Sequence, residues 1–246
     1  MKISSLQHPL VKHLVKLRKN RSYRYKNNTV VVEGKKLVSE VCQKQKARNI
    51  LAIEESLIPK KVKTEESYLV SYDILKKISG VQNPEGILAE VLMPPEGSLE
   101  GFRYVVAFDG VGDPGNLGTL LRTALALGWE GAFILNNSCD PYNDKAVRSA
   151  KGATFRLPIR QGLWKEVKAL IKNNGLQPVA ADLKGKNFDE LPSRGGVLLV
   201  LGSESRGLSE EARDFCEKIT IPMSGKMESL NVSVAGGILM YGIIGQ

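Results

Sequence analysis

Three segments in the C-terminal half combine polar side chains with glycine-rich turns: 113–124 (DPGNLGTLLRTA), 201–208 (LGSESRGL) and 221–237 (IPMSGKMESLNVSVAGG). In the first, Asn116 stands where a helix would begin, so its side chain can cap that helix. Arg122 lies six positions later in an otherwise apolar stretch. A guanidinium in such surroundings needs an anionic partner, which makes it a candidate for binding a phosphate or a carboxylate.

The other two segments place polar groups beside apolar elements. Gly202 and Glu204 directly follow the uninterrupted apolar run 197–201, and Ser229 and Asn231 open an almost wholly apolar stretch. Ligands of open α/β sheets bind outside the carboxyl ends of the strands, where Gly202 and Glu204 would lie. Each of these residues taken alone also fits a structural role, as a cap, a turn or a polar group in the core.

A fourth pattern suggests different chemistry. Residues 110–115 (GVGDPG) match GxGxxG between a predicted strand and a predicted helix, as in dinucleotide-binding proteins. Pro114 removes a backbone donor that a phosphate-binding turn would use, and residues 135–139 lack the acidic residue expected after the second strand. We interpret this pattern as a glycine-rich turn. A nicotinamide-dependent oxidoreductase rests on this pattern alone, and it ranks below the two RNA-related hypotheses given at the end of this subsection.

Composition excludes several classes of protein. The 246 residues are 42% hydrophobic and 25% charged, which is typical of a folded chain. No apolar run is long enough for a membrane span, and the N-terminus does not resemble a secretory signal. Cys42, Cys139 and Cys216 lack metal-binding spacing and indicate reduced thiols in a cytoplasmic protein. With only His8 and His13 available, we expect no metal site and no Ser-His-Asp triad.

Positive charge is concentrated near the N-terminus. Residues 1–63 hold 16 Lys and Arg against 4 Asp and Glu, while the whole chain has a net charge of +9. Such a patch attracts phosphate backbones. Tyr23 and Tyr25 alternate with Arg21 and Arg24, so their rings could stack on bases. The alternatives are a solubilising arm and, more weakly, a membrane-surface segment.

Apolar periodicity predicts a small α/β domain followed by a larger one. The N-terminal elements are expected at 9–19 (helix), 29–33 (strand), from 34 (helix), 49–53 (strand), 73–78 (helix) and 86–92 (strand). The Pro- and Gly-rich stretch 93–98 resembles a linker, so the predicted domains are 1–97 and 98–246.

In the second domain, strands and helices are predicted to alternate. Strands are expected at 104–108, 131–135, 177–181, 197–201 and 218–221. Helices are expected at 117–127, 144–150, 163–172, 209–216 and 230–244. This alternation predicts a parallel sheet in a three-layer α/β domain.

Together these segments resemble a known family. The motifs GNLGTLLRTA (115–124), LGSESRGLSEE (201–211) and IPMSGKMESLNVSVAGGI (221–238) are similar to the three motifs of the SpoU (TrmH) branch of the SPOUT superfamily of RNA methyltransferases. The segments SLQHPLVK (5–12), VEG (32–34) and GILA (86–89) resemble its ribosomal-protein-like RNA-binding domain. The resemblance therefore covers nearly the whole chain.

The resemblance implies transfer of a methyl group from S-adenosylmethionine to a ribose 2′-hydroxyl of RNA. It also implies a C-terminal domain with a deep trefoil knot, an exception to the usual unknotted topology. By motif, the cofactor contacts would be Gly202, Ile221 and Leu230. The functional polar residues would be Asn116, Arg122, Glu204, Ser229 and Asn231. Ser203, Ser205 and Gly236 depart from the residues usual at their positions.

Methyl transfer from a sulfonium needs alignment of donor and oxygen and help with loss of the hydroxyl proton. A family role as base has been proposed for the counterpart of Arg122. Because the pKa of an arginine exceeds about 12, we favour clamping of a phosphate and of the developing alkoxide. The prediction from sequence is thus an RNA 2′-O-methyltransferase that acts on ribosomal RNA rather than transfer RNA and forms a homodimer. The alternative is a non-enzymatic RNA-binding or ribosome-assembly protein.

Overall fold

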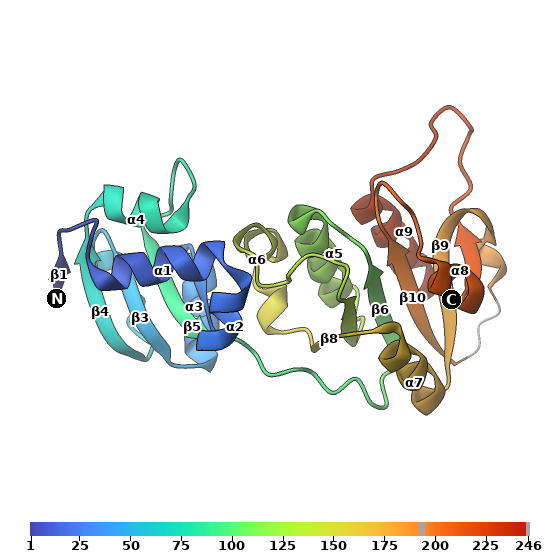
Figure 1. The fold of residues 1–246 in the computed structure, drawn as a ribbon, viewed down its shortest axis with the longest axis horizontal. Helices are drawn as coiled ribbons and strands as arrows, with labels where there is room; N and C mark the ends of the chain where they lie inside the picture. The colour runs from blue at the N-terminus through green and yellow to red at the C-terminus, as the bar shows by residue number, and fades with distance from the viewer. Residues whose placement is uncertain (192–194, 245–246) are drawn as a thin grey trace. The chain divides into compact units, whose positions relative to one another are not determined.

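The computed structural model describes residues 1–191 and 195–244 and divides the chain into two compact units (Figure 1). The first contains Met1–Pro94 together with Tyr142–Phe155, and the second contains Pro95–Pro141 and the chain from Arg156 onward. The sequence boundary at 97/98 assigns 142–155 to the second domain, whereas its contacts group it with the first unit. In the part of the chain that the structure describes, no helix is both long and apolar enough to cross a membrane.

The first unit is a five-stranded mixed sheet between helices. Its strands are β1 (Lys2–Ile3), β2 (Thr29–Glu33), β3 (Ala47–Ala52), β4 (Thr64–Val70) and β5 (Ile87–Leu92). Its helices are α1 (Pro9–Lys19), α2 (Arg21–Asn27), α3 (Lys35–Lys44), α4 (Tyr72–Ser79) and α6 (Asp144–Ala150), with 3₁₀ turns at Glu55–Leu57 and Ala153–Phe155. The strand order is β1-β4-β3-β5-β2, with β5 antiparallel to both β2 and β3.

Alternating strand residues bury both faces of this sheet. Val31 of β2 packs with the apolar stripes of α1 and α4, whereas Val30 and Val32 pack against α3 on the opposite face. Burying each such side chain contributes about 1.5–3 kcal/mol. Tyr142 and Val147 from the inserted segment belong to the α3 side of this core. The first unit is therefore completed by residues that come from the C-terminal half of the sequence.

The second unit is a six-stranded parallel sheet. Its strands are β6 (Tyr104–Asp109), β7 (Gly131–Leu135), β8 (Ile159–Gly162), β9 (Leu176–Asn187), β10 (Gly196–Gly202) and β11 (Glu217–Thr220), in the order β11-β9-β10-β6-β7-β8. Its helices are α5 (Pro114–Ala126), α7 (Trp164–Asn174), α8 (Glu210–Phe215) and α9 (Val232–Ile244), with a 3₁₀ turn at Phe188–Glu190.

Helices cover both faces of this sheet, so the predicted three-layer arrangement is confirmed. Apolar residues of α7 and α8 pack with Val105, Leu198 and Val200 on one face. On the other face α5 and α9 lie against each other, and the indole N–H of Trp129 donates to the carbonyl of Met240 at 3.1 Å. The sheet order places β10 between β6 and β9, with its carboxyl end at Gly202. That end carries the candidate site.

Besides the two-residue strand β1 and the 3₁₀ turns, the sequence missed α2, β4 and β8. The α2 segment is polar all round, and its buried residue is Arg24 rather than an apolar side chain. The β4 strand begins with the polar residues 64–67 and is mostly half-exposed or exposed, and β8 has only four residues at the sheet edge. Apolar periodicity detects none of these, because it reports only elements that bury an apolar face.

Candidate active site

The glycine-rich 110–115 segment leads from β6 into α5. Gly110 adopts a φ of +82°, in the region that favours glycine. Asp113 then caps α5, accepting the backbone N–H of Asn116 at 2.9 Å, and Pro114 occupies the first turn. The GxGxxG match is therefore the start of a capped helix, and Asn116 sits in its first turn rather than at the cap position predicted from the sequence.

Asn116 joins the three sequence motifs in one hydrogen-bonded network. Its side-chain Nδ2 donates to Glu204 Oε1 at 2.9 Å, and its Oδ1 accepts from Asn231 Nδ2 at 3.2 Å. The second carboxylate oxygen of Glu204 accepts the backbone N–H of Gly112 at 3.3 Å. These contacts link residues that lie 88 and 115 positions apart in the sequence. The fold thus assembles polar groups that the motifs only suggested.

Asn231 also caps the last helix. Its Oδ1 accepts the backbone N–H and the hydroxyl of Ser233, at 2.8 Å and 2.6 Å. The backbone N–H groups of Val234 and Ala235 bond to its carbonyl oxygen. Asn231 therefore fixes both the start of α9 and the orientation of the Asn116 amide.

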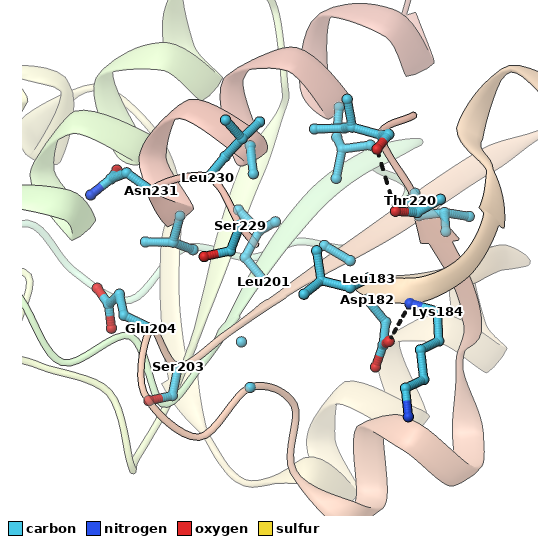
Figure 2. A pocket seen from close by; sticks show the side chains of 18 of the residues that line it. Asp182, Leu183, Lys184, Leu201, Ser203, Glu204, Thr220, Ser229, Leu230 and Asn231 are labelled. Atoms are coloured by element: carbon cyan, nitrogen blue, oxygen red, sulfur yellow. Dashed lines mark hydrogen bonds between the residues drawn. The ribbon is translucent and has the colours of Figure 1, made fainter. Parts of the chain in front are cut away.

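A cavity of about 660 Å³ opens beside this network, next to the middle of β9 and the carboxyl ends of β10 and β11. Of the residues that the sequence suggested for the site, six line it: Gly202, Glu204, Ile221, Ser229, Leu230 and Asn231. Figure 2 shows Ser229, Leu230 and Asn231 on the side opposite Asp182, Leu183 and Lys184. The last three lie within β9, beyond its pairing with β10, and carry no motif in the sequence, so sequence reasoning missed them.

The cavity has the chemistry that S-adenosylmethionine requires. Apolar side chains such as Leu201, Ile219 and Leu239 line it, while Asp182 and Lys184 place charges of both signs along the same wall. The cofactor has a flat apolar-faced adenine and a zwitterionic amino-acid end. Small-molecule sites of about 300–1,000 Å³ with few polar groups are usual. The residues present therefore fit this cofactor.

Glycine is required at position 202 by the chain's own backbone and not by the approach of a ligand. A Cβ built there would lie 2.7 Å from the carbonyl carbon of Gly207 and 2.8 Å from the amide nitrogen of Leu208. The obstacle is therefore the backbone of the chain's own 203–208 turn, which Ser203 and Gly207 close with two hydrogen bonds of 2.9 Å. A larger residue at 202 would displace that turn.

Arg122 lies outside the network and outside the cavity described above. Its side chain is exposed, and it is absent from the lining of the cavity. The apolar side of α5 is formed by Leu117, Leu120 and Leu121, and Arg122 falls outside that stripe. Glu204, which could have paired with Arg122, binds Asn116 and Gly112 instead.

The groups of this site that could accept a proton are the carboxylates of Glu204 and Asp182, because the nearby thiol cannot. Cys139 follows β7, and burial, together with the charges of Asp140, Asp113 and Glu204, raises the pKa of its thiol to about 12. That thiol stays protonated at neutral pH. Among residues 1–191 and 195–244, no group of three or more His, Cys, Asp or Glu is arranged to hold a metal ion.

Two residues of the predicted base-stacking segment have structural roles instead. Arg24 is 2% exposed and donates to the carbonyl oxygens of Leu17 and Arg18 at 2.7 and 2.8 Å. The Tyr23 hydroxyl lies 2.9 Å from His13 Nδ1, and the two rings pack edge to face. Tyr25 remains exposed on 38% of its surface.

Comparison with known proteins identifies the family. A model described as the SpoU rRNA Methylase family matches residues 103–241, and one described as an MRM3-like substrate binding domain matches residues 8–89. The chain belongs to the SpoU rRNA methylase family. It is 34% identical to the 23S rRNA (guanosine(2553)-2'-O)-methyltransferase RlmP of Bacillus subtilis, over 99% of both chains.

Solved structures of SpoU methyltransferases share the fold. An S-adenosylmethionine-bound rRNA methyltransferase from Sinorhizobium meliloti aligns with a TM-score of 0.84 and 26% identity, covering 99% of this chain and 97% of the other. The S-adenosylmethionine complex of AviRb from Streptomyces viridochromogenes aligns at 0.86 and 26%, covering 97% of each. The family, the fold class, the enzyme class and the cofactor expected from the sequence are confirmed, and the oxidoreductase hypothesis is wrong.

Proposed function

We propose that this protein transfers a methyl group from S-adenosylmethionine to a ribose 2′-hydroxyl of ribosomal RNA, in the cytoplasm where that RNA is available. The observation that carries the proposal is the Asn116–Glu204–Asn231 network beside a cofactor-sized cavity. The full-length similarity to a methyltransferase of 23S ribosomal RNA favours ribosomal RNA over transfer RNA.

The cavity walls supply the cofactor contacts in this proposal. Gly202, Ile221 and Leu230 come from three separate segments that meet at the ends of β10 and β11. The cofactor, when bound, supplies an electrophilic methyl group on a sulfonium. Ser229 and Asn231 lie on the same wall as Leu230, so their polar atoms can orient the incoming ribose hydroxyl. The fold proposed for this domain includes the trefoil knot.

Glu204 and Asn116 act as a pair. Because Glu204 accepts from Asn116 and from the Gly112 N–H, its carboxylate holds the loop before α5 against the loop after β10. The carboxylate is exposed toward the cavity side and can also accept a hydrogen bond from a substrate hydroxyl. Such positioning converts a bimolecular reaction into one between fixed groups.

We also propose that the enzyme is a homodimer that is built on α9. Although α9 is apolar along nearly its whole length, Val234, Ile238 and Tyr241 are 50%, 40% and 72% exposed. These positions recur at helical spacing and form one apolar stripe. In the proposed homodimer, a second copy of the chain covers this stripe. Arg122, on the exposed side of neighbouring α5, would then serve at the interface as an electrostatic clamp on the RNA.

Two measurements test the proposal. Purified protein, labelled S-adenosylmethionine and ribosomes or ribosomal RNA from cells that lack the protein should give a 2′-O-methyl group at one nucleotide. Incorporation only into transfer RNA would overturn the substrate assignment, and cofactor binding without any methylation of RNA would favour the RNA-binding alternative. Sedimentation should give a species of twice the 27.0 kDa chain mass, and Tyr241→Glu should reduce it to the monomer. A monomeric wild-type protein would contradict the dimer.

A further inference from the structure

Asp109 is a buried carboxylate that the proposed reaction does not use. It is the last residue of β6, it pairs in register with Gly202 of β10, and it is 1% exposed. It is not among the residues that line the cavity. Burying a carboxylate is costly unless hydrogen bonds compensate it. The hydrogen-bond partners of the Asp109 carboxylate therefore indicate its role.

Each carboxylate oxygen of Asp109 accepts a hydrogen bond from a different loop. Oδ1 accepts from the side-chain Nδ2 of Asn137, after β7, at 2.9 Å, and Oδ2 accepts the backbone N–H of Ser209, before α8, at 3.0 Å. Ser209 in turn caps α8 through its hydroxyl, which accepts the N–H of Ala212 at 3.2 Å. One side chain thus joins the ends of three neighbouring strands.

The contact to Ser209 fixes the far end of the turn that carries the cavity residues. The 202–209 turn begins at Gly202, is closed upon itself by Ser203 and Gly207, and is held to the α5 loop by Glu204. Asp109 holds its exit at Ser209. If the exit moved, Gly202 and Glu204 would move with it.

We infer that Asp109 is a positioning residue for methyl transfer, which holds the 202–209 turn in the conformation that binds S-adenosylmethionine. This inference rests on the proposed function. It assigns Asp109 no contact with the cofactor or the RNA. Its effect passes through the Ser209 N–H and reaches the cavity as the placement of Gly202 and Glu204.

The experiment compares variants of the full-length protein by titration calorimetry with S-adenosylmethionine, below the melting temperature of each variant. Asp109→Ala removes both acceptors and should raise the Kd about tenfold or more, the factor expected for a lost hydrogen bond to a charged group. Asp109→Asn keeps an acceptor for the Ser209 N–H, and its own amide can donate to Asn137 once that exposed amide turns over. Its Kd should stay within about threefold of the wild type.

Asn174→Ala is the matched control for loss of stability alone. Asn174 makes three hydrogen bonds to the 99–102 loop, at the opposite ends of the strands. This variant should melt earlier and bind the cofactor with unchanged Kd. A second check is Asn137→Asp, which sets a carboxylate against Asp109 and should weaken binding, whereas Asp109→Asn combined with Asn137→Asp should restore it. Amide hydrogen exchange at Ser209 should quicken in Asp109→Ala.

The outcomes separate the two ideas. Wild-type Kd in Asp109→Ala, or equal weakening in Asp109→Asn, would overturn the positioning role, as would an equal affinity loss in Asn174→Ala. If instead the wild-type protein failed to bind S-adenosylmethionine at all, the proposed function itself would fail.

Discussion

The polar network of the second unit and the basic segment of the first unit differ in how the fold uses the residues that the sequence suggested for function. Asn116, Glu204 and Asn231 lie far apart in sequence, and the fold brings their side chains into contact. Arg24 and Tyr23 belong to one short polar segment, and the fold uses both to hold the unit together. Three separate motifs identified the first set, whereas local composition alone suggested the second.

The difference lies in what each pattern measures. A charge count reports how many cations a segment carries, not which of them reach solvent, and a long side chain can satisfy carbonyl groups inside the protein. A capping or turn motif instead fixes backbone geometry, so its side chains project from a defined place. The following predictions test this division, from the largest expected effect to the smallest.

Arg122 is the exception among the motif residues of the second unit, because it belongs to the first motif but makes no hydrogen bond with the Asn116–Glu204–Asn231 network. Arg122→Ala should lower the methylation rate by about 10²–10³, or roughly 3–4 kcal/mol, if it stabilises charge in the transition state. Because its side chain is exposed, the melting temperature should not change. Arg122→Lys should restore little, since the planar fork is lost.

Single-turnover rate and melting temperature are measured on the same Arg122→Ala sample. Lys172→Ala, an exposed cation on α7 over the other face of the sheet, is the control and should leave both unchanged. A lower melting temperature with normal turnover in Arg122→Ala would show that Arg122 has a structural role. A motif would then be no better guide to function than the charge count of the basic segment.

Much of the fold followed from the sequence. The α1 helix, β2, β7 and α6 have the predicted limits, because each presents a clear apolar face or a capped end. The site was predicted as a set of residues but not as a geometry. Neither the reason for glycine at 202, the backbone of Gly207, nor the anchoring by Asp109 has a local sequence signal, because both arise between segments that only the folded chain brings together.

Among the cationic residues of the basic segment, Arg24 should contribute most to the stability of the first unit. Arg24→Ala removes two hydrogen bonds to buried carbonyl groups and the packing of the side chain, so unfolding of the first unit should become easier by about 3 kcal/mol. Lys26→Ala, two positions later on an exposed site, should cost almost nothing. Urea unfolding of the two variants, followed by far-ultraviolet circular dichroism, measures both changes in stability. Equal stability of the two variants would contradict the structural role.

Glu90 gives the first unit a pH dependence. It is 1% exposed, with His13 Nε2 at 3.0 Å and Asn49 Nδ2 at 2.7 Å. Burial raises the pKa of Glu90, but the hydrogen bonds from His13 and Asn49 outweigh it and bring the pKa below its ordinary value. The resulting stability is complete above the unfolded pKa of about 4.3 and is lost as the pH falls through the lower folded pKa.

Glu90→Gln should therefore be about 1.5 kcal/mol less stable than the wild type at neutral pH, the size of one hydrogen bond to a charged group. The difference should shrink as the pH falls below about 4.3. Denaturant unfolding of both proteins at a series of pH values provides the measurement. A difference that stays constant down to the acid limit would mean that the Glu90 charge contributes nothing.

The smallest effects should come from exposed lysines of the basic segment, each of which can neutralise a phosphate of the RNA. Lys12 and Lys19 lie on α1 with exposed side chains, outside its buried stripe of Val11, Leu14 and Leu17. If each neutralises one phosphate, alanine at either position should weaken RNA binding uniformly and reduce the slope of log Kd against log salt by roughly 1. The melting temperature should stay fixed, in contrast to Arg24→Ala. Filter binding of ribosomal RNA across a salt series measures the slope. An unchanged slope when both lysines are replaced by alanine would show that neither Lys12 nor Lys19 contacts the phosphates of the RNA, and the basic segment around them would not be the RNA-binding surface.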